Sequence, residues 1–253
     1  MSILNLFSIK VRTVILAAML FPVASAEPSP VVVQAFSAMG DSGKEDASRF
    51  NVTAKTVLAP AYPYLAEQIT ESFGLADKRG TGIDIGGGPG NLVLELARCS
   101  PGFSWINVDI NPFFASYLYE GALEKGCAER VGFLPADVHE LPLRDNYADV
   151  VVSRGSLQQW RDREKAFSEI YRILKPGGRA FIGRGFSENL PLETAREVRA
   201  RQGGGPRYDP DNSARELEEM MARLGIEGFQ VTRPRTDQEQ VNYGVWVVFQ
   251  KPE

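Results

Sequence analysis

From residue 50 onward, short apolar runs alternate with longer stretches in which apolar residues recur at helical spacing. The apolar runs have the length of strands and lie at 82–85, 103–110, 131–136, 149–153 and 179–183. The helical stretches between them lie at 91–98, 112–125 and 163–174. Strands that alternate with helices in this way predict an α/β fold with a doubly wound, mostly parallel sheet and right-handed crossovers.

The last quarter of the chain predicts a change of direction in this sheet. Two more helices are expected at 192–201 and 212–224, and two more strands at 229–233 and 241–251. Only a short polar stretch separates these two strands, whereas a parallel pair needs a crossover of about a dozen residues or more. We therefore expect one domain over residues 50–253, with a seven-stranded, Rossmann-like sheet whose last strand is antiparallel.

The amino-terminal segment predicts an address signal rather than a part of the fold. Lys10 and Arg12 precede the apolar run 14–21, and Ala24-Ser25-Ala26 forms a small-residue cleavage site. The run is shorter than the roughly 20 residues that span a bilayer, so no transmembrane span is expected in the mature chain. We predict a signal peptide over residues 1–26 and an exported or periplasmic protein; a cytoplasmic or a membrane-tethered protein is the alternative.

The segments that follow this signal carry weaker patterns. Residues 27–49 show no sustained period and are expected to form a flexible leader before the folded domain. The stretch 53–73 has helical character but contains Pro60 and Pro63, which lack the N–H group that a helix interior needs. This stretch predicts two short helices.

Composition and charge exclude several classes of protein. Of the 253 residues, 43% are hydrophobic and 24% are charged, as in ordinary globular proteins. The formal net charge of −4 gives no general attraction for a phosphate backbone, so nucleic acid is not an expected partner. A single histidine and two cysteines, Cys99 and Cys127, cannot supply a four-ligand zinc site, and no metal is expected. Whether these cysteines pair is left open.

A glycine-rich turn between the first strand and its helix carries the main chemical signal. It reads Asp84-Ile85-Gly86-Gly87-Gly88-Pro89-Gly90-Asn91. Glycines here let a ligand approach the backbone and leave amide groups free at a helix N-terminus. Asn91 stands where the dinucleotide fingerprint needs its third glycine, which weakens that interpretation. Asp84 suits a ligand with an ammonium group, so a nucleoside that bears an amino acid fits better.

The chain resembles the class I S-adenosylmethionine-dependent methyltransferases over residues 81–186, especially the small-molecule type with the motif D-x-G-x-G-x-G. Asp109 ends the second strand 19 residues after Gly90, Asp137 follows the third strand, and residues 166–178 look like the family's helix and turn before the fifth strand. The resemblance implies S-adenosylmethionine as cofactor, with Asp109 accepting from the ribose and Asp137 from the adenine amino group. The cofactor-binding residues expected on this basis are Asp84, Gly86, Gly88, Gly90, Asp109, Ile110, Asp137, Val138 and Ser153.

The acceptor is expected beside the loop after the fourth strand, because open α/β sheets bind ligands at the carboxyl ends of their strands. The side chains assigned to the substrate are Tyr62, Tyr64, Arg154, Gln159 and Trp160. Trp160 is alternatively a buried anchor of a rigid loop, and Tyr62 and Tyr64, which with Phe50 are expected to cover the cofactor, are alternatively core aromatics. An arginine cluster near the last helices is either a solvated face or a lid over an acidic acceptor: Arg196, Arg199, Arg201 and Arg207.

No catalytic base is assigned from the sequence. His139 lies in the loop expected near adenine, and Asp149 at the start of a buried strand is expected to be structural. Methyl transfer needs mainly a held acceptor and exclusion of water, so a strong base is optional. We therefore predict a methyltransferase for a small-molecule acceptor; the alternatives are a non-catalytic S-adenosylmethionine-binding protein and an enzyme with a different reaction of the same cofactor. The sequence defines neither the acceptor atom nor the oligomeric state.

Overall fold

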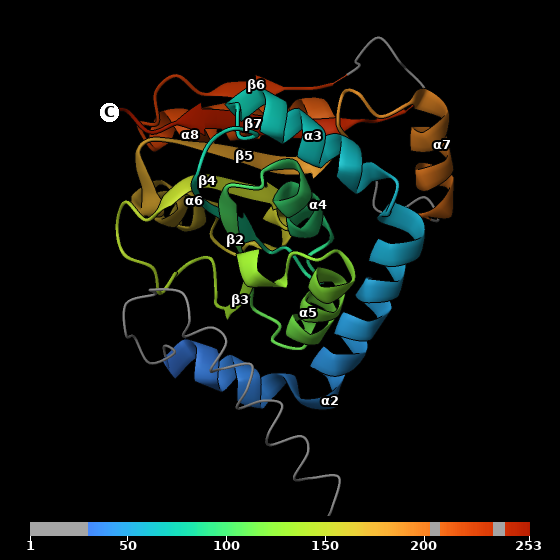
Figure 1. The fold of residues 1–253 in the computed structure, drawn as a ribbon. Coiled ribbons are helices and arrows are strands. Elements are labelled where there is room, and N and C mark those ends of the chain that lie inside the picture. Colours follow the sequence, from blue (N-terminus) through green and yellow to red (C-terminus); the bar gives the residue numbers. More distant parts are fainter. Residues whose placement is uncertain (1–29, 203–207, 235–240) are drawn as a thin grey trace, which may run out of the picture.

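The computed structural model describes residues 30–202, 208–234 and 241–253, with side chains from residue 40 onward. Seven strands form one sheet in the order β3-β2-β1-β4-β5-β7-β6 (Figure 1). Strands β1 to β5 run parallel, whereas β7 is antiparallel to both β5 and β6. The predicted Rossmann-like sheet with an antiparallel last strand is therefore confirmed. The strands are β1 (Gly80–Ile85), β2 (Phe103–Asp109), β3 (Val131–Pro135), β4 (Ala148–Arg154), β5 (Leu174–Gly185), β6 (Gln230–Thr232) and β7 (Gly244–Gln250).

Helices cover both faces of the sheet (Figure 1). Helices α3, α4 and α5 pack on one face and α6 and α8 on the other, and each face has its own apolar cluster. Strand β4 shows why, since Val150 and Val152 join the first cluster and Val151 the second. The helices are α2 (Pro30–Thr53), α3 (Ala61–Phe73), α4 (Asn91–Cys99), α5 (Phe114–Glu124), α6 (Arg163–Ile173), α7 (Leu192–Arg201) and α8 (Pro210–Arg223).

The amino-terminal segment differs from the flexible leader that the sequence predicted. Helix α2 occupies Pro30–Thr53, with a kink at Gly40, and a π-helical turn at Ala54–Leu58 continues it toward α3. Residues 41–49 are almost entirely polar, so they show no apolar period. Tertiary contacts hold the helix: Ala47 is fully buried, and the Gly43 carbonyl accepts a hydrogen bond of 2.8 Å from Asn111 Nδ2.

The amino-terminal end of β4 carries a structural carboxylate. Asp149 Oδ2 accepts hydrogen bonds of 2.7 Å from the Thr81 backbone and from Lys175 Nζ. These contacts join β1, β4 and the start of β5, which supports the structural role expected for Asp149. Strand β5 begins earlier than predicted, because Leu174 already pairs with Ala148 before an irregularity in the register.

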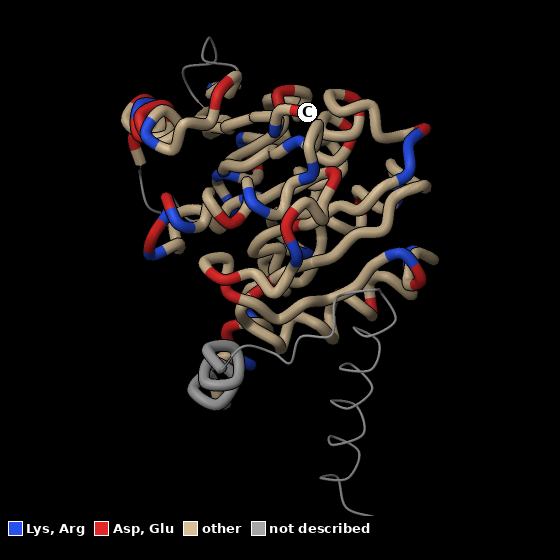
Figure 2. Tube along the Cα trace, turned by 90° about the vertical axis from the view of Figure 1, so that its left-hand side faces the viewer, with Lys and Arg blue, Asp and Glu red and all other residues tan. Residues whose placement is uncertain are grey.

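The surface charges, the cysteines and the helix lengths also bear on the expectations from the sequence. Acidic and basic positions are interspersed over the side of the molecule shown in Figure 2. Cys99 and Cys127 are both free. None of the helices in the described residues combines the length and the apolar character needed to cross a membrane.

Candidate functional site

The glycine turn after β1 has a backbone that other residues do not easily adopt. Gly86, Gly88 and Gly90 have φ angles of 66°, 56° and 84°, in the left-handed region. A Cβ atom at Gly86 would lie 2.5 Å from Ser156 Oγ, and one at Gly90 would lie 2.3 Å from Leu118 Cδ1. The turn therefore packs closely on its neighbours and leads its amides into the N-terminus of α4, where an anionic group is favoured.

Asp84 lies beneath this turn with no hydrogen-bond partner. Its residue is 1% exposed, and neither carboxyl oxygen has a partner among the described residues. Burial raises the pKa of Asp84 well above its ordinary value, the charge of Asp109 raises it further, and Arg154 opposes the shift. A buried, unpartnered carboxyl group is unfavourable, so it favours a ligand that brings a positive charge.

Asn107 pairs with Asp84 in register on β2 and holds the turn from below. Its Nδ2 donates a hydrogen bond of 2.8 Å to the Gly88 carbonyl, while its Oδ1 has no partner among the described residues. A Cβ atom at Gly87 would lie 1.8 Å from that oxygen. Asn107 therefore leaves no room for a side chain at position 87, a restriction that the glycine pattern alone did not predict.

Asp109 at the end of β2 is joined to the same turn. Its Oδ2 accepts a hydrogen bond of 2.9 Å from the Gly88 N–H group, and its Oδ1 accepts one of 2.9 Å from Asn111 N–H. Burial raises the pKa of Asp109 to about 6, while the backbone hydrogen bonds oppose the shift. Each carboxylate oxygen has room for a further donor, so two neighbouring hydroxyl groups of a sugar suit this position.

The loop after β3 forms the next part of the site. Burial alone would raise the pKa of Asp137, but hydrogen bonds from His139 and the charge of Arg161 outweigh it and lower the pKa. Val138 is buried, whereas the Ile110 side chain after β2 is 43% exposed. An ionised acceptor with an exposed apolar side chain nearby suits an aromatic base that carries an amino group.

His139 is held in place at both ring nitrogens. Its Nδ1 contacts Asp137 Oδ1, and its Nε2 accepts a hydrogen bond of 3.2 Å from the Asp162 backbone. Asp162 in turn caps α6 by accepting from the Lys165 N–H group. His139 therefore connects the loop to α6 and leaves no ring nitrogen for proton transfer.

Ser153 lies deeper than a direct cofactor contact requires. Its hydroxyl donates to the Ile85 carbonyl at 2.8 Å and lies 2.7 Å from Ser156 Oγ. Ser156 also donates to the Ile85 carbonyl, at 3.1 Å. The two serines fix the end of β1 directly before the glycine turn, and sequence reasoning missed Ser156 because a serine in a loop has no distinctive pattern.

Helix α2 closes one side of the glycine turn. A Cβ atom at Gly88 would lie 3.0 Å from the Phe50 ring, which itself packs edge-on against Phe114 with a centroid distance of 6.0 Å. Asn111, whose backbone binds Asp109, is tied to α2 through the Gly43 carbonyl. Residues 43–50 thus contribute to the site, although the sequence predicted most of them to be a loose leader.

Tyr62 and Arg154, two of the residues assigned to the substrate, lie against each other. The Arg154 guanidinium carbon lies 5.2 Å from the centroid of the Tyr62 ring, and Arg154 Nε donates to the Gly185 carbonyl at 3.3 Å. Burial raises the pKa of Tyr62, Arg154 lowers it, and Asp84 adds to the rise. Tyr62, Arg154 and Asp84 therefore form one electrostatic group that links the glycine turn to the ends of β4 and β5.

Other residues assigned to the substrate lie elsewhere. Trp160 packs against Phe167 at a centroid distance of 5.8 Å, in the apolar cluster of the α6 face. Tyr62 belongs to the cluster on the opposite face, so these two aromatics do not enclose one space. Gln159 is exposed, and Tyr64 packs at the border of the Tyr62 cluster. Trp160 is thus the buried loop anchor that was the alternative interpretation.

The predicted arginine cluster is only partly brought together. Arg199 turns inward, with its guanidinium carbon 4.3 Å from the Phe186 ring centroid, and donates to the Asn242 carbonyl at 2.6 Å. Arg196 forms an ion pair with Glu193, and Arg201 is exposed. Arg207 lies outside the described residues. Arg184, directly after the strand predicted at 179–183, was not singled out from the sequence; it lies on β5, and its charge lowers the pKa of Arg199.

The fold is that of a Rossmann-like α/β protein, and the residues at the carboxyl ends of β1, β2 and β3 suit a nucleoside with an amino-acid group. Comparison with known proteins narrows this class. Residues 83–182 match the family model described as "Methyltransferase domain". A solved structure from Methanococcus maripaludis, described as a "putative s-adenosyl-l-methionine-dependent methyltransferase", is 32% identical with a TM-score of 0.72. The match covers 83% of this chain and 94% of that chain.

Curated methyltransferases also match the chain, but over a shorter region. The ubiquinone/menaquinone biosynthesis C-methyltransferase UbiE of Stutzerimonas stutzeri is 37% identical over 101 residues, 40% of each chain. The UbiE protein of Brucella abortus is 34% identical over 114 residues, 44% of this chain and 42% of that protein. The chain thus spans less than half the length of these relatives. It belongs to the class I S-adenosylmethionine-dependent methyltransferases, and its cofactor is S-adenosyl-L-methionine.

The site fits this cofactor. The unpartnered Asp84 suits its ammonium group, and Asp109 has acceptor capacity for a ribose. The part of the chain with described side chains contains no group of histidine, cysteine and acidic residues that would hold a metal ion.

Proposed function

We propose that the chain transfers the methyl group of S-adenosylmethionine to a small-molecule acceptor held beside Tyr62 and Arg154. The observation that carries this proposal is the electrostatic group of Asp84, Tyr62 and Arg154, which connects the glycine turn to the ends of β4 and β5. One side of this group faces the nucleoside residues of β1 and β2. The other side offers a phenol and a guanidinium to a second ligand.

We assign the parts of the cofactor to residues at the carboxyl ends of successive strands. Asp84 and the turn Gly86, Gly88 and Gly90 would hold the amino-acid part, and Asp109 the ribose. Ile110, Asp137 and Val138 would enclose the adenine. Support comes from the unpartnered oxygens of Asp84, the two backbone-bound oxygens of Asp109 and the exposed face of Ile110. Ser153 would act indirectly, by fixing the Ile85 carbonyl.

The protein's part in the reaction is to place and shield. The bound cofactor supplies an activated methyl group on a sulfonium centre. Tyr62 keeps its phenolic proton because burial raises its pKa, so its hydroxyl can orient an acceptor without ionising. Helix α2 and Phe50 exclude water from the side of the glycine turn. No base is needed for an acceptor that attacks with a free lone pair, and His139 is held at both nitrogens.

The experiment is a product assay combined with calorimetry. Purified protein is titrated with S-adenosylmethionine and then incubated with it and mixtures of small nucleophiles, while S-adenosylhomocysteine is measured by mass spectrometry. Formation of S-adenosylhomocysteine that depends on an added acceptor is expected. Binding without product under every mixture would favour a non-catalytic binding protein, and methylthioadenosine as the product would indicate a different reaction. The Asp109→Ala variant is the control for specific binding.

We also propose that the mature chain begins at Glu27 after export. The positive charges, the short apolar run and the Ala24-Ser25-Ala26 site support this, although residues 1–29 lie outside the described part of the chain. Cleavage there would leave helix α2 (Pro30–Thr53) whole. Amino-terminal sequencing of the native protein should give Glu27. An intact Met1, or a start at Met39, would contradict export with cleavage.

A further inference from the structure

Three arginines from different elements meet at the carboxyl ends of β4 and β5. Arg154 ends β4 and binds the Gly185 carbonyl, next to Arg184 on β5. Arg199 comes from α7 and lies over the ring of Phe186, two residues after Arg184. In Figure 1, α7 stands at the edge of the sheet beside the end of α2. The fold therefore places three guanidinium groups in one region, although their residues are up to 45 positions apart.

None of the ion pairs between described residues includes Arg154, Arg184 or Arg199. The charge of Arg154 lowers the pKa of Asp84 without forming an ion pair with it. Burial lowers the pKa of Arg199, Tyr208 opposes this shift, and the positive charges of Arg154 and Arg184 add to it. Arginine stays ionised in proteins, so the cluster keeps its repulsion unless an anion binds.

Tyr208 adds an independent sign of a missing ligand. The Arg184 guanidinium carbon lies 3.7 Å from the centroid of the Tyr208 ring. The hydroxyl oxygen of Tyr208 is buried and has no hydrogen-bond partner in the described part of the chain. Such a hydroxyl is unfavourable without a partner, and an oxyanion beside Arg184 would give it one.

The position of the cluster separates it from the cofactor. The nucleoside residues lie on β1, β2 and β3, whereas Arg184 lies on β5, two strands beyond β1 in the other direction. Neighbouring strands are about 4.8 Å apart, so the backbones of β1 and β5 are separated by about 10 Å. Arg154 lies between them and contacts Tyr62. The cluster is therefore separate from the nucleoside residues, and Arg154 is its link to Tyr62.

We propose that Arg154, Arg184 and Arg199 bind an oxyanion, a carboxylate or a phosphate, carried by the methyl acceptor. This inference rests on the proposed function, in which the acceptor lies beside Tyr62. The planar guanidinium fork matches both kinds of oxyanion in two-point contacts, and Tyr208 donates from its hydroxyl. The acceptor is thus an acid or a phosphate ester, held by its charged end while its nucleophile points toward Tyr62.

The test uses inorganic phosphate and acetate as probes. Calorimetry measures the affinity of each probe for the protein saturated with S-adenosylhomocysteine. The ionic strength is kept constant, and chloride is the reference anion. At least one probe should bind, and Arg184→Gln and Arg199→Gln should each weaken it about 10- to 100-fold. The stronger probe identifies the phosphate or the carboxylate class. Arg215→Gln, an exposed arginine on α8, is the matched control and should bind as the wild type does.

Affinity for S-adenosylmethionine, measured on the same samples, keeps the two proposals apart. Arg184→Gln should leave it unchanged within twofold, which also shows that the variant is folded. Where Arg184→Gln fails to fold, Arg184→Lys replaces it and should still weaken the probe, because a lysine lacks the planar fork. If the wild-type protein does not bind S-adenosylmethionine, the proposed function is wrong. Normal cofactor binding with no probe bound, or with equal probe affinity in both variants, would overturn only the oxyanion site. Equal weakening of cofactor and probe would overturn it too, because the cluster would then serve the cofactor.

Discussion

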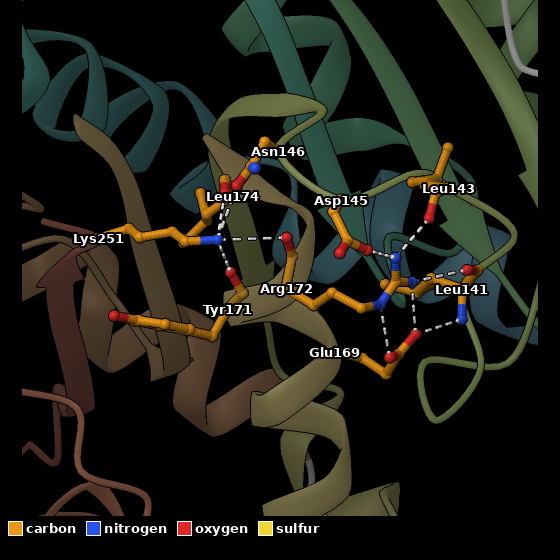
Figure 3. Close-up of polar contacts among 9 residues, drawn as sticks. All are labelled: Leu141, Leu143, Asp145, Asn146, Glu169, Tyr171, Arg172, Leu174 and Lys251. Carbon is orange, nitrogen blue, oxygen red and sulfur yellow. Dashed lines mark hydrogen bonds and ion pairs between the residues drawn. The ribbon is translucent and has the colours of Figure 1, made fainter. Parts of the chain in front are cut away.

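Two groups of basic side chains in this molecule differ in how their charge is balanced. At the ends of α6 and β7, Arg172 donates five hydrogen bonds: to both oxygens of Glu169, to Asp145, and to the carbonyls of Leu141 and Leu143 (Figure 3). At the carboxyl ends of the strands, the Arg184 side chain has no hydrogen bond or ion pair with any described residue. One group is complete within the protein, and the other has donors left over.

Lys251, which contacts the backbone of Arg172, also has its hydrogen-bond donors satisfied within the protein. Lys251 Nζ donates to Asn146 Oδ1 and to the carbonyls of Tyr171, Arg172 and Leu174, at 2.9 to 3.4 Å (Figure 3). These bonds join the carboxyl terminus to α6 and to the loop before β4. The paired charges join elements of the fold, whereas the arginines at the ends of β4 and β5, which form no ion pair with a described residue, are the ones for which we propose a ligand.

The largest expected effect is loss of stability at the paired end. Arg172→Ala removes five hydrogen bonds and leaves Glu169 half-buried without its partner, so unfolding should become easier by about 2–4 kcal/mol. Urea unfolding measures this change. Cofactor affinity should stay unchanged, because the residue is remote from the glycine turn. Arg215→Ala, an exposed control, should change stability by less than about 0.5 kcal/mol.

A loss of cofactor affinity is expected at the ligand end. Asp109→Ala removes the carboxylate that accepts from Gly88 and Asn111 and, in the proposed complex, from the ribose. Binding of S-adenosylmethionine should weaken by about 1.5–3 kcal/mol. Calorimetry measures it, with the exposed Asp77→Ala as a control that should bind normally. Unchanged affinity in Asp109→Ala would remove the ribose assignment.

Much of the fold could be predicted from the sequence, because parallel strands buried on both faces read as short apolar runs. The strands that became β2 and β4 were predicted within one residue of their observed ends. Helix α2 was missed for a physical reason. Its residues 41–49 are almost entirely polar, with Ala47 as the one apolar side chain, which is buried. Other contacts of the helix come from Phe50 against Phe114 and from the Asn111 hydrogen bond, and such isolated contacts leave no apolar period in this stretch.

The site was predictable where a pattern is local. Asp84 lies near the end of β1, Asp109 ends β2 and Asp137 follows β3, so their order along the chain could be inferred from spacing. The role of Arg184 could not be inferred from the sequence. It depends on α7 and on Tyr208, which are brought close to Arg184 only when the chain folds. Trp160 was assigned to the acceptor from its place in a loop, but it turns toward the opposite face of the sheet.

Asp84 offers a smaller effect that separates binding from stability. Asp84→Asn keeps the shape of a neutral carboxyl group, and burial already favours the neutral form by raising the pKa of Asp84. Stability should therefore change by less than about 0.5 kcal/mol, while cofactor affinity should fall by about 1–2 kcal/mol, because no carboxylate can form beside the ammonium group. Urea unfolding and calorimetry measure the two. A large loss of stability would mean that Asp84 has a structural partner.

The smallest effect is a pH dependence of cofactor binding, about 1.4 kcal/mol for one pH unit. Burial raises the pKa of Asp109 from 3.8 to about 6, so in the free protein the carboxyl group is neutral below pH 6 and ionised above it. For folding, a raised carboxyl pKa favours the native state most below pH 3.8, and this contribution is lost as the pH rises through 6.

For binding the sign is opposite, because the ribose hydroxyls need the ionised acceptor. Affinity for S-adenosylmethionine should be constant above pH 7 and about tenfold weaker at pH 5. Calorimetry in the Asp84→Asn background isolates Asp109, since Asp84 then has no proton to exchange. Asp109→Asn in the same background should flatten the profile, whereas Arg172→Ala should leave its shape unchanged. A profile that still falls below pH 6 without the Asp109 carboxylate would assign the titration to another group and would remove Asp109 from the set of charges that a ligand completes.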